Sequence, residues 1–222
     1  MRRRRVLVFG AGGQAKIIVD ALHLSSGDEP VGYVDDSRPP GTEWFGLPVL
    51  GPMADLGSIV EDHGIDAGIV SVGDNYRRGA VVDDVEAALP GFVWVNAIHP
   101  MVAIGKGCEI GVGVHMMAGA VVNPASIVGD HVHIDTRASL DHDSTLGRCA
   151  SLGPTAATGG GCTIGEFTAV AIGAVVVHGT TIGAHTVVGA GATVLADLPD
   201  HVVAFGTPAR VIRQRAPGER YL

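Results

Sequence analysis

Every sixth residue between Ile98 and Val194 is apolar, with Thr158 as the one exception, and the register never slips. An amphipathic helix repeats its apolar residues every three or four positions, so it cannot produce a strict period of six. A short strand followed by a tight corner can produce it, because each side of a coil then presents one large inward side chain. The period therefore predicts a β-solenoid over residues 96–198.

Two further positions of each hexad support this interpretation. The fifth position is small, as in Ala120 and Ala138, and the second is often glycine, as in Gly129 and Gly147. We interpret the fifth residue as a second inward side chain, and the glycine as a source of backbone freedom at the corner. Three sides make a coil of 18 residues, so residues 18 apart are expected to lie above one another. The pattern does not determine the handedness of the solenoid.

The first 95 residues have a different texture, in which short apolar runs alternate with helical patterns as in a βαβ unit. We expect strands at residues 5–9, 31–34, 48–50, 67–72 and 92–95. Helices are expected at residues 14–24, 53–63 and 77–89. This order predicts a small, parallel, Rossmann-like α/β domain over residues 1–95.

The last segment, residues 199–222, leaves the register at Pro199 and passes through FGTPAR into what we expect to be a short helical segment. The open end of a solenoid exposes unpaired strand edges. A tail that covers this end is therefore expected whatever the function of the protein.

Charge and composition exclude several classes of partner. The formal net charge is -8 at pH 7, and the only basic run is formed by the arginines at positions 2–5, so there is no electrostatic footprint for nucleic acid. No apolar stretch approaches the roughly 20 residues of a membrane helix, and we expect a cytoplasmic protein without a membrane partner. The 3 cysteines lack CxxC spacing and predict neither a disulfide framework nor a zinc site.

One histidine is flanked by two carboxylates in an otherwise charge-poor stretch. His142 lies between Asp141 and Asp143, at the third position of its hexad. A carboxylate beside an imidazole fixes its tautomer and stabilises its protonated form, which suits a general base; the alternative is a solvated loop. The residue one coil above is Gly160, in a run of three glycines whose N–H groups could hold a developing oxyanion, and His178 lies two coils above.

A second candidate site follows the first expected strand. Gly10, Gly12 and Gly13 open a helix there, and Asp35 and Asp36 come about 20 residues further on. This spacing satisfies the dinucleotide fingerprint, in which backbone N–H groups and a helix N-terminus face a phosphate. The domain is too short for two mononucleotide-binding halves, so a nucleotide linked to something smaller is favoured over a dehydrogenase cofactor.

Four stretches in this order, VLVFGAGGQAK, YVDD, LDHD within the hexads and GTPARVIR, resemble the sialic acid O-acetyltransferase and nucleotide-sugar N-acetyltransferase family. The resemblance covers nearly the whole chain and implies a left-handed parallel β-helix behind a Rossmann-like domain. It also implies a homotrimer that transfers an acetyl group from acetyl-CoA to a UDP- or dTDP-linked amino sugar. Whether an amine or a hydroxyl accepts the group stays open.

The resemblance further implies roles for individual residues. His142 would be the general base, Asp143 its acidic partner and Gly160 the glycine whose amide meets the thioester carbonyl. The acceptor would be held by Gly10, Gly12, Gly13, Gln14, Asp35, Asp36 and Ser151. CoA would be held by Gly160, Gly161, His178, Pro208 and Arg210, and no metal is implied. This chain has Gln14 and Ser151 where the family commonly has histidine, so both departures concern the acceptor.

Three other interpretations remain. His142 and His178 are 36 residues apart, as are two zinc ligands of the γ-type carbonic anhydrases, but the third ligand would fall at Gly183. Cys149 is a conceivable nucleophile, although nothing in the sequence pairs it with a base, and a buried filler is favoured. The solenoid could also be a non-catalytic trimeric scaffold whose N-terminal domain senses a nucleotide.

Overall fold

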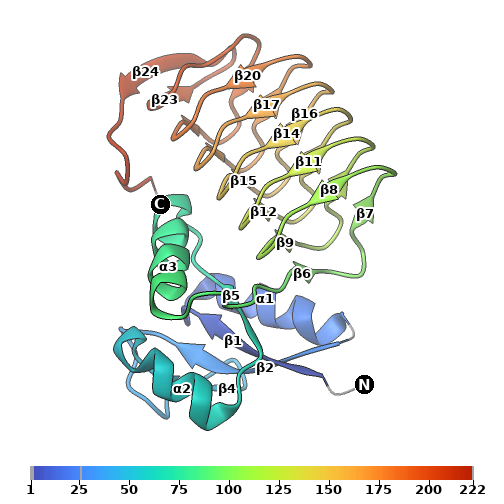
Figure 1. Cartoon of the computed structure of the whole chain (residues 1–222). Helices are drawn as coiled ribbons and strands as arrows, with labels where there is room; N and C mark the ends of the chain where they lie inside the picture. Colours follow the sequence, from blue (N-terminus) through green and yellow to red (C-terminus); the bar gives the residue numbers. More distant parts are fainter. Residues whose placement is uncertain (1–2, 26, 222) are drawn as a thin grey trace.

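The computed structural model describes residues 3–25 and 27–221 (Figure 1). Arg2, the first of the four arginines, lies outside these residues. An α/β domain at the N-terminus is followed by a solenoid, and the chain then returns so that its last described residues lie beside the N-terminal domain. None of the described helices is both long and apolar enough to span a membrane.

The N-terminal domain contains one sheet in the order β3-β4-β2-β1-β5. Its parallel strands are β1 (Arg4–Phe9), β2 (Asp28–Val34), β4 (Leu47–Gly51) and β5 (Ala67–Val70). The edge strand β3 (Glu43–Trp44) is antiparallel to β4. The helices are α1 (Gly13–Leu24), α2 (Leu56–His63), which follows the short 3-10 helix η1 (Met53–Asp55), and α3 (Asn75–Ala88). The predicted parallel α/β domain is confirmed.

The strand expected at residues 92–95 does not form. Only one isolated bridge joins this stretch to the sheet, between Gly68 and Trp94. The side chains of Phe92 and Trp94 instead pack edge-on against Phe9 with ring centroids 5.9 and 5.7 Å away. Residues 92–95 therefore connect α3 to the solenoid while their aromatic side chains fill the core of the domain. Their apolar character alone did not indicate whether the backbone pairs with the sheet.

The solenoid is a left-handed parallel β-helix of three sheets, as predicted. The first sheet contains β6 (Ala97–Ile98), β9 (His115–Met116), β12 (His133–Ile134), β15 (Ser151–Leu152), β18 (Ala169–Val170) and β21 (Val187–Val188). The second contains β7 (Ala103–Ile104), β10 (Val121–Val122), β13 (Ser139–Leu140), β16 (Ala157–Thr158), β19 (Val175–Val176) and β22 (Thr193–Val194). The third contains β8 (Glu109–Ile110), β11 (Ile127–Val128), β14 (Thr145–Leu146), β17 (Thr163–Ile164) and β20 (Thr181–Ile182).

Paired residues of neighbouring coils are 18 apart from β6 to β22, as between Val122 and Leu140, whereas the last bridge, between Ile182 and Leu198, departs from this spacing. The large and small inward side chains form one continuous apolar core, in which Val122, Leu140 and Ala138 are fully buried. Ile104 is 43% exposed, because the first coil has no coil beneath it. The hexad period therefore predicted both the register and the core correctly.

The reason given for the corner glycines is wrong. Glycine at the second position of the hexad does not have a positive φ. Its role is to leave space, because a Cβ at Gly129 would lie 2.9 Å from the Arg148 nitrogen and one at Gly105 only 2.5 Å from the Pro124 nitrogen. The left-handed residue is the fourth of the hexad, at every such position from Gly107 to Gly191, where non-glycine residues such as Ala125 (φ 60) are also found. Close stacking of coils, rather than backbone freedom, therefore requires the glycines.

The tail forms a β-hairpin, so the expected helical segment after residue 210 is also wrong. Strand β23 (Val202–Phe205) adds in parallel to β21, and β24 (Arg210–Gln214) pairs with β23 in antiparallel fashion. The free edge of β23 offers unpaired backbone groups to the following segment, and this tertiary pairing determines its conformation. These two strands extend the first sheet beyond its last coil strand, β21.

A buried arginine joins the two units. Arg78 in α3 is 0% exposed. Its Nε donates to the carbonyl oxygen of His131, and one Nη donates to that of Cys149, both at 2.8 Å. The other Nη donates to the carbonyl oxygens of Val72 and Gly73 at 3.0 and 3.1 Å. One guanidinium thereby holds two successive coils against the loop that precedes α3, which fixes the domain on the solenoid.

Candidate functional site

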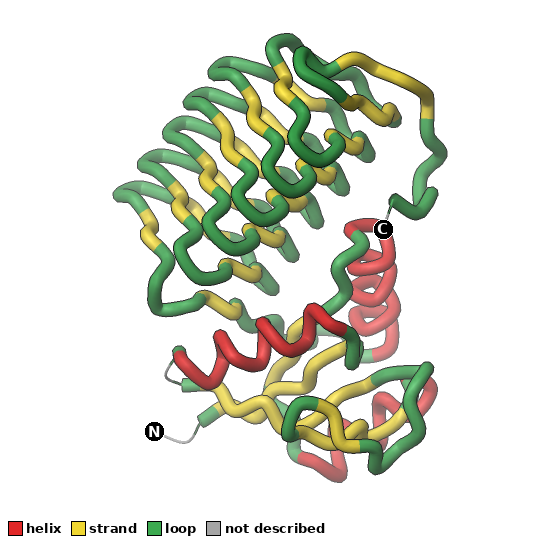
Figure 2. The backbone as a smooth tube through the Cα atoms, turned by 180° about the vertical axis from the view of Figure 1, so that it is seen from behind, coloured by secondary structure: helices red, strands yellow, loops and turns green. Residues whose placement is uncertain are grey.

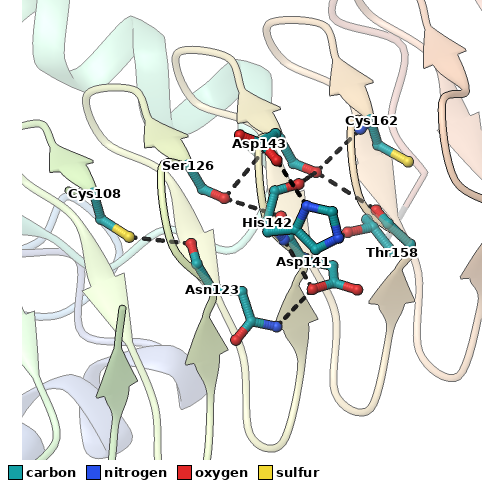
Figure 3. Close-up of polar contacts among 10 residues, drawn as sticks. Cys108, Asn123, Ser126, Asp141, His142, Asp143, Thr158 and Cys162 are labelled. Atoms are coloured by element: carbon teal, nitrogen blue, oxygen red, sulfur yellow. Dashed lines mark hydrogen bonds and ion pairs between the residues drawn. The ribbon is translucent and has the colours of Figure 1, made fainter. Parts of the chain in front are cut away.

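The His142 corner, residues 141–143, connects β13 to β14 (Figure 3). The His142 Nδ1 lies 2.8 Å from Oδ2 of Asp143, and the two side chains are 58% and 69% exposed. Asp143 occupies the left-handed fourth position with φ 56, so its carboxylate turns back toward the preceding imidazole. The adjacent pair seen in the sequence is thus an actual hydrogen-bonded dyad that leaves Nε2 open to solvent.

The second carboxylate of the corner organises the backbone. Oδ1 of Asp141 accepts hydrogen bonds from the His142 N–H at 2.8 Å and from Nδ2 of Asn123 at 2.7 Å. The Asp141 N–H in turn donates to Oγ1 of Thr158 at 3.0 Å. Thr158 is the one residue that interrupts the apolar column. Thr158 places a hydroxyl where the other hexads have an aliphatic carbon. This hydroxyl binds the corner that carries His142.

Two serines fix the same corner from inside the coil. Oγ of Ser126 donates to the carbonyl oxygen of Asp141 at 2.9 Å, and Oγ of Ser144 donates to that of His142 at 3.2 Å. Both serines occupy the small fifth position of their hexads and are fully buried. The carbonyl groups are therefore satisfied within the protein. The backbone of the corner is therefore held by hydrogen bonds, although its side chains are exposed.

The two carboxylates raise the pKa of His142, mainly through the hydrogen bond with Asp143 and then through the charge of Asp141. The hydrogen bond from the His142 N–H is the main cause that lowers the pKa of Asp141. Asp141 is therefore ionised at neutral pH. A raised pKa makes the imidazole a stronger proton acceptor, which is the property a general base requires.

Gly160 lies directly against the imidazole. A Cβ there would be 2.4 Å from Cε1 and 2.5 Å from Nε2 of His142, so only glycine fits. The Gly161 N–H donates to the His142 carbonyl oxygen at 2.8 Å, whereas the Gly160 N–H has no acceptor in the described part of the chain. His178 is exposed on the next coil. The predicted neighbours of His142 are thus in place, with one free N–H beside the ring.

The glycine loop and Asp35 line a cleft of ≈ 680 Å³ in the N-terminal domain. Gly10, Gly12, Gly13 and Gln14 are part of its lining. Oδ2 of Asp35 accepts from the Ala11 N–H at 2.6 Å and so holds the loop. Although burial acts to raise it, hydrogen bonds from Ser37 and the Ala11 N–H keep the pKa of Asp35 below its usual value. The carboxylate is therefore structural, and the first turn of α1 is left facing the cleft.

Asp36 does not line this large cleft. It borders an adjoining pocket of ≈ 200 Å³, which also contains Gly10, Asp35 and Arg77. Oδ1 of Asp36 accepts from the Met53 N–H at 2.8 Å, so one carboxylate oxygen is already used. The residues predicted around the glycine loop therefore surround two connected spaces.

The two departures from the family pattern meet in a further cleft of ≈ 390 Å³ between the domain and the solenoid, which Gln14 and Ser151 both line. The Gln14 side-chain amide donates to Nε2 of His133 at 2.6 Å. Burial, and then the charge of Arg78, lowers the pKa of His133 to about 3, so the imidazole is neutral and can accept this bond. Oγ of Ser151 accepts from Nδ2 of Asn75 at 3.1 Å.

Sequence reasoning missed His133, which supplies an imidazole to the cleft that contains Gln14 and Ser151. The register contained the necessary information, because His115, His133 and Ser151 are 18 residues apart on the first sheet. This column faces outward on a sheet that the domain covers. Without knowledge of which sheet is covered, the polar column could not be distinguished from an exposed one.

The structure does not bring all the predicted residues together within one chain. His142 lines none of the three clefts described above. Pro208 and Arg210 lie at the tail hairpin, where an Nη of Arg210 bonds only to the Ala209 carbonyl oxygen at 2.9 Å. Within residues 3–25 and 27–221, no three or more His, Cys, Asp or Glu side chains are grouped as metal ligands.

The chain is similar to several known proteins. Residues 5–85 match the family described as the PglD N-terminal domain. A histidine-to-asparagine variant of perosamine N-acetyltransferase from Caulobacter crescentus, in complex with CoA and GDP-perosamine, is 37% identical, with a TM-score of 0.88 over 94% of this chain and 97% of that chain. The acetyltransferase domain of PglB from Neisseria gonorrhoeae FA1090, in complex with acetyl coenzyme A, is 32% identical, with a TM-score of 0.86 over 95% and 100%.

A more distant structure shares the fold alone. WeeI from Acinetobacter baumannii AYE is 22% identical, with a TM-score of 0.74 over 94% of this chain and 100% of that chain. A search of the curated proteins found no match.

Proposed function

Because the chain belongs to the family of hexapeptide-repeat nucleotide-sugar N-acetyltransferases, we propose that it transfers the acetyl group of acetyl-CoA to the amine of a nucleotide-linked amino sugar. The observation that carries the proposal is the His142 corner. It combines an imidazole paired with Asp143, an open Nε2 and the free N–H of Gly160 beside the ring. These are the groups that direct acyl transfer requires.

The chemistry follows from these positions. The amine nitrogen attacks the thioester carbonyl carbon, and Nε2 of His142 takes the proton that the amine loses. The negative charge that develops on the carbonyl oxygen is met by the Gly160 N–H. When the carbon–sulfur bond breaks, the imidazolium returns the proton to the CoA sulfur. Asp143 keeps the ring oriented and stabilises its charged form throughout.

The nucleotide of the acceptor is assigned to the glycine-loop cleft. The helix N-terminus at Gly12 and Gly13 has no acidic residue in its first turn, and a Cβ at either glycine would meet nothing within 4 Å, so a diphosphate can approach. The adjoining pocket beside Asp36 has room for the nucleobase of the acceptor. One relative was solved with GDP-perosamine, so guanine belongs in the screen beside uracil and thymine.

We further propose a homotrimer in which His142 of one copy faces the acceptor clefts of the next. The general base, His142, must meet the acceptor amine, and none of the three clefts described above contains both His142 and the residues assigned to the acceptor. Ile127 and Val175, on the two sheets that flank the His142 corner, are 44% and 41% exposed, as expected for a surface that a second copy covers. The CoA assignment of Gly161, His178, Pro208 and Arg210, the cytoplasmic location and the lack of a nucleic-acid partner remain predictions.

The first test is a calorimetric titration of acetyl-CoA into the purified protein, whose oligomeric state is measured by light scattering. We expect saturable binding near one molecule per chain and a trimeric mass. A screen of GDP-, UDP- and dTDP-linked amino sugars would then identify the acceptor. A folded trimer that binds no acetyl-CoA would overturn the acetyltransferase proposal and favour a nucleotide-sensing scaffold.

A further inference from the structure

The segment after the tail hairpin, which we call the strap (residues 215–221), crosses back from the end of the solenoid to α3 (Figures 1 and 2). Arg215 anchors it and is 7% exposed. An Nη of Arg215 donates to the His185 carbonyl oxygen at 2.8 Å, and its backbone N–H donates to that of His201 at 2.8 Å. The second Nη donates to the Glu219 carbonyl oxygen. Arg215 thus binds the start of the strap to the solenoid, and it also bonds to Glu219 within the strap.

The other end of the strap is tied to the N-terminal domain. The Tyr221 ring packs against the first-sheet residues Ala169 and Val187. Its hydroxyl oxygen accepts from the N–H of Asn75, the first residue of α3, at 3.2 Å. At Gly218, where φ is +75, a Cβ would lie 2.8 Å from the Tyr76 ring, so the turn is pressed against α3. Burial is the main cause that raises the pKa of the Tyr221 hydroxyl, which is therefore neutral.

The strap also contributes to both acceptor clefts. Arg220 lines the large cleft together with Gly10 and Gly12 of the glycine loop, and Tyr221 lines the smaller cleft that contains Gln14 and Ser151. The strap was expected only to cover a strand edge, but it contributes one lining residue to each of the two clefts. The position of the strap depends on the length of the solenoid, because the chain passes through every coil before it returns to α3.

The charges around Arg220 leave it available for a ligand. Its side chain is exposed and has no ion pair or hydrogen bond in the described structure, and Arg77 lines the same cleft. Three carboxylates share this lining, from Asp35, Asp74 and Asp84. The first is bonded to the Ala11 N–H and to Ser37, and the second accepts from the Arg77 N–H at 2.9 Å as the cap of α3. Two arginines therefore line the same cleft as the N-terminus of α1, a combination that suits a diphosphate.

We propose that the strap is a working part of the acceptor site, in which Arg220 binds the diphosphate of the nucleotide sugar and Tyr221 holds Arg220 in place. The inference rests on the proposed function and adds a binding residue that neither the sequence pattern nor the family motifs indicated. Tyr221 is a positioning residue, since it contacts α3 and the solenoid and acts on the ligand through its neighbour.

The test measures the binding of GDP, UDP and dTDP, each titrated alone by calorimetry into the full-length protein. We expect the Arg220→Ala variant to raise the Kd of the preferred diphosphate about tenfold, with a weaker salt dependence, since a charge-assisted contact is lost. Arg220→Lys should recover part of this loss. Arg4→Ala is the matched control, because this arginine pairs with Asp28 at the start of β1 and lines none of the acceptor clefts formed by the described residues.

A second variant, Tyr221→Phe, removes only the hydroxyl that meets Asn75. We expect a rise of about threefold in the same Kd and in the KM for the nucleotide sugar, with the Kd for acetyl-CoA unchanged. Unchanged diphosphate binding by Arg220→Ala, with wild-type protein that does bind, would overturn the inference alone. Wild-type protein that binds acetyl-CoA but none of the diphosphates would overturn the acceptor assignment on which the inference rests.

Discussion

Two histidines on different corners of the same solenoid each have their ring against a glycine of a neighbouring coil. Their pKa values are nevertheless shifted in opposite directions. The His142 ring lies over Gly160 of the next coil, and the His131 ring lies over Gly113 of the previous one, where a Cβ would be 2.2 Å from Nδ1. His142 is exposed and paired with Asp143. His131 is 2% exposed and lies edge-on to Trp94 with ring centroids 5.1 Å apart.

The difference arises from what covers each corner. The N-terminal domain covers the corner of His131, and burial is the main cause that lowers its pKa to about 4. No described segment of the chain covers the corner of His142, and the neighbouring carboxylates raise its pKa. The repeat therefore determines where a side chain stands, while elements outside the repeat determine its protonation state.

The largest effect is expected from His142→Ala. Removing a general base typically lowers turnover by 10²–10⁴-fold, so we expect kcat to fall about 10³-fold, or about 4 kcal/mol. Because the side chain is 58% exposed in the single chain, we expect the thermal unfolding midpoint and the mass of the proposed trimer to stay unchanged. The rate of acetyl transfer and the mass by light scattering check both points. Near-normal turnover would remove His142 from the role of base.

The buried histidine should affect stability instead. The folded-state pKa of His131 is below the unfolded value of about 6.5, so the unfolded chain binds the proton more readily and stability is lost as pH falls from 6.5 toward 4. The loss from this group at pH 5 is about 2 kcal/mol. Urea unfolding of wild type and His131→Phe at pH 7 and pH 5 measures it.

The variant in this experiment is chosen so that the backbone can accept it, because Phe167 already occupies the same hexad position with φ 56. His131→Phe should lose less stability than wild type on acidification. His142→Ala should instead lose more stability than wild type on acidification, because the raised pKa of His142 contributes stability that is present below pH 6.5 and is lost as pH rises. An equal loss in wild type and His131→Phe would show that His131 is not buried in its neutral form in solution.

The comparison also shows what the sequence could and could not reveal. The period of six gave the register, the core and the stacking of His142 on Gly160, because these depend only on residues 18 apart. It could not reveal that His133 lies beneath Gln14, nor that Tyr221 reaches Asn75, because both depend on where the domain and tail dock. The tail sequence RVIRQ has no periodicity strong enough to separate a helix from an edge strand, and pairing with β23 decided the outcome.

A smaller loss is expected from Gly160→Ala. The added Cβ would lie 2.4 Å from Cε1 of His142, so the ring has to turn away from the site where the oxyanion develops. We expect kcat to fall about 10²-fold, comparable to the loss of one oxyanion donor. Gly57→Ala in α2 is the control, because Gly57 has no positive φ and a Cβ there meets nothing within 4 Å. Equal activity of the two variants would contradict the close packing of His142 on Gly160.

The smallest effect should come from Thr158→Val, which changes the shape of the column little and removes the acceptor for the Asp141 N–H. A lost hydrogen bond of this kind is worth about 1 kcal/mol, so we expect kcat to fall about fivefold. Loosening Asp141 also weakens its charge effect on the imidazole, so the rising limb of the pH–rate profile should move to lower pH. Thr158→Ser keeps the hydroxyl and should restore both values. Because stability alone would not shift the profile, an unchanged profile in Thr158→Val would reduce Thr158 to a filler of the core.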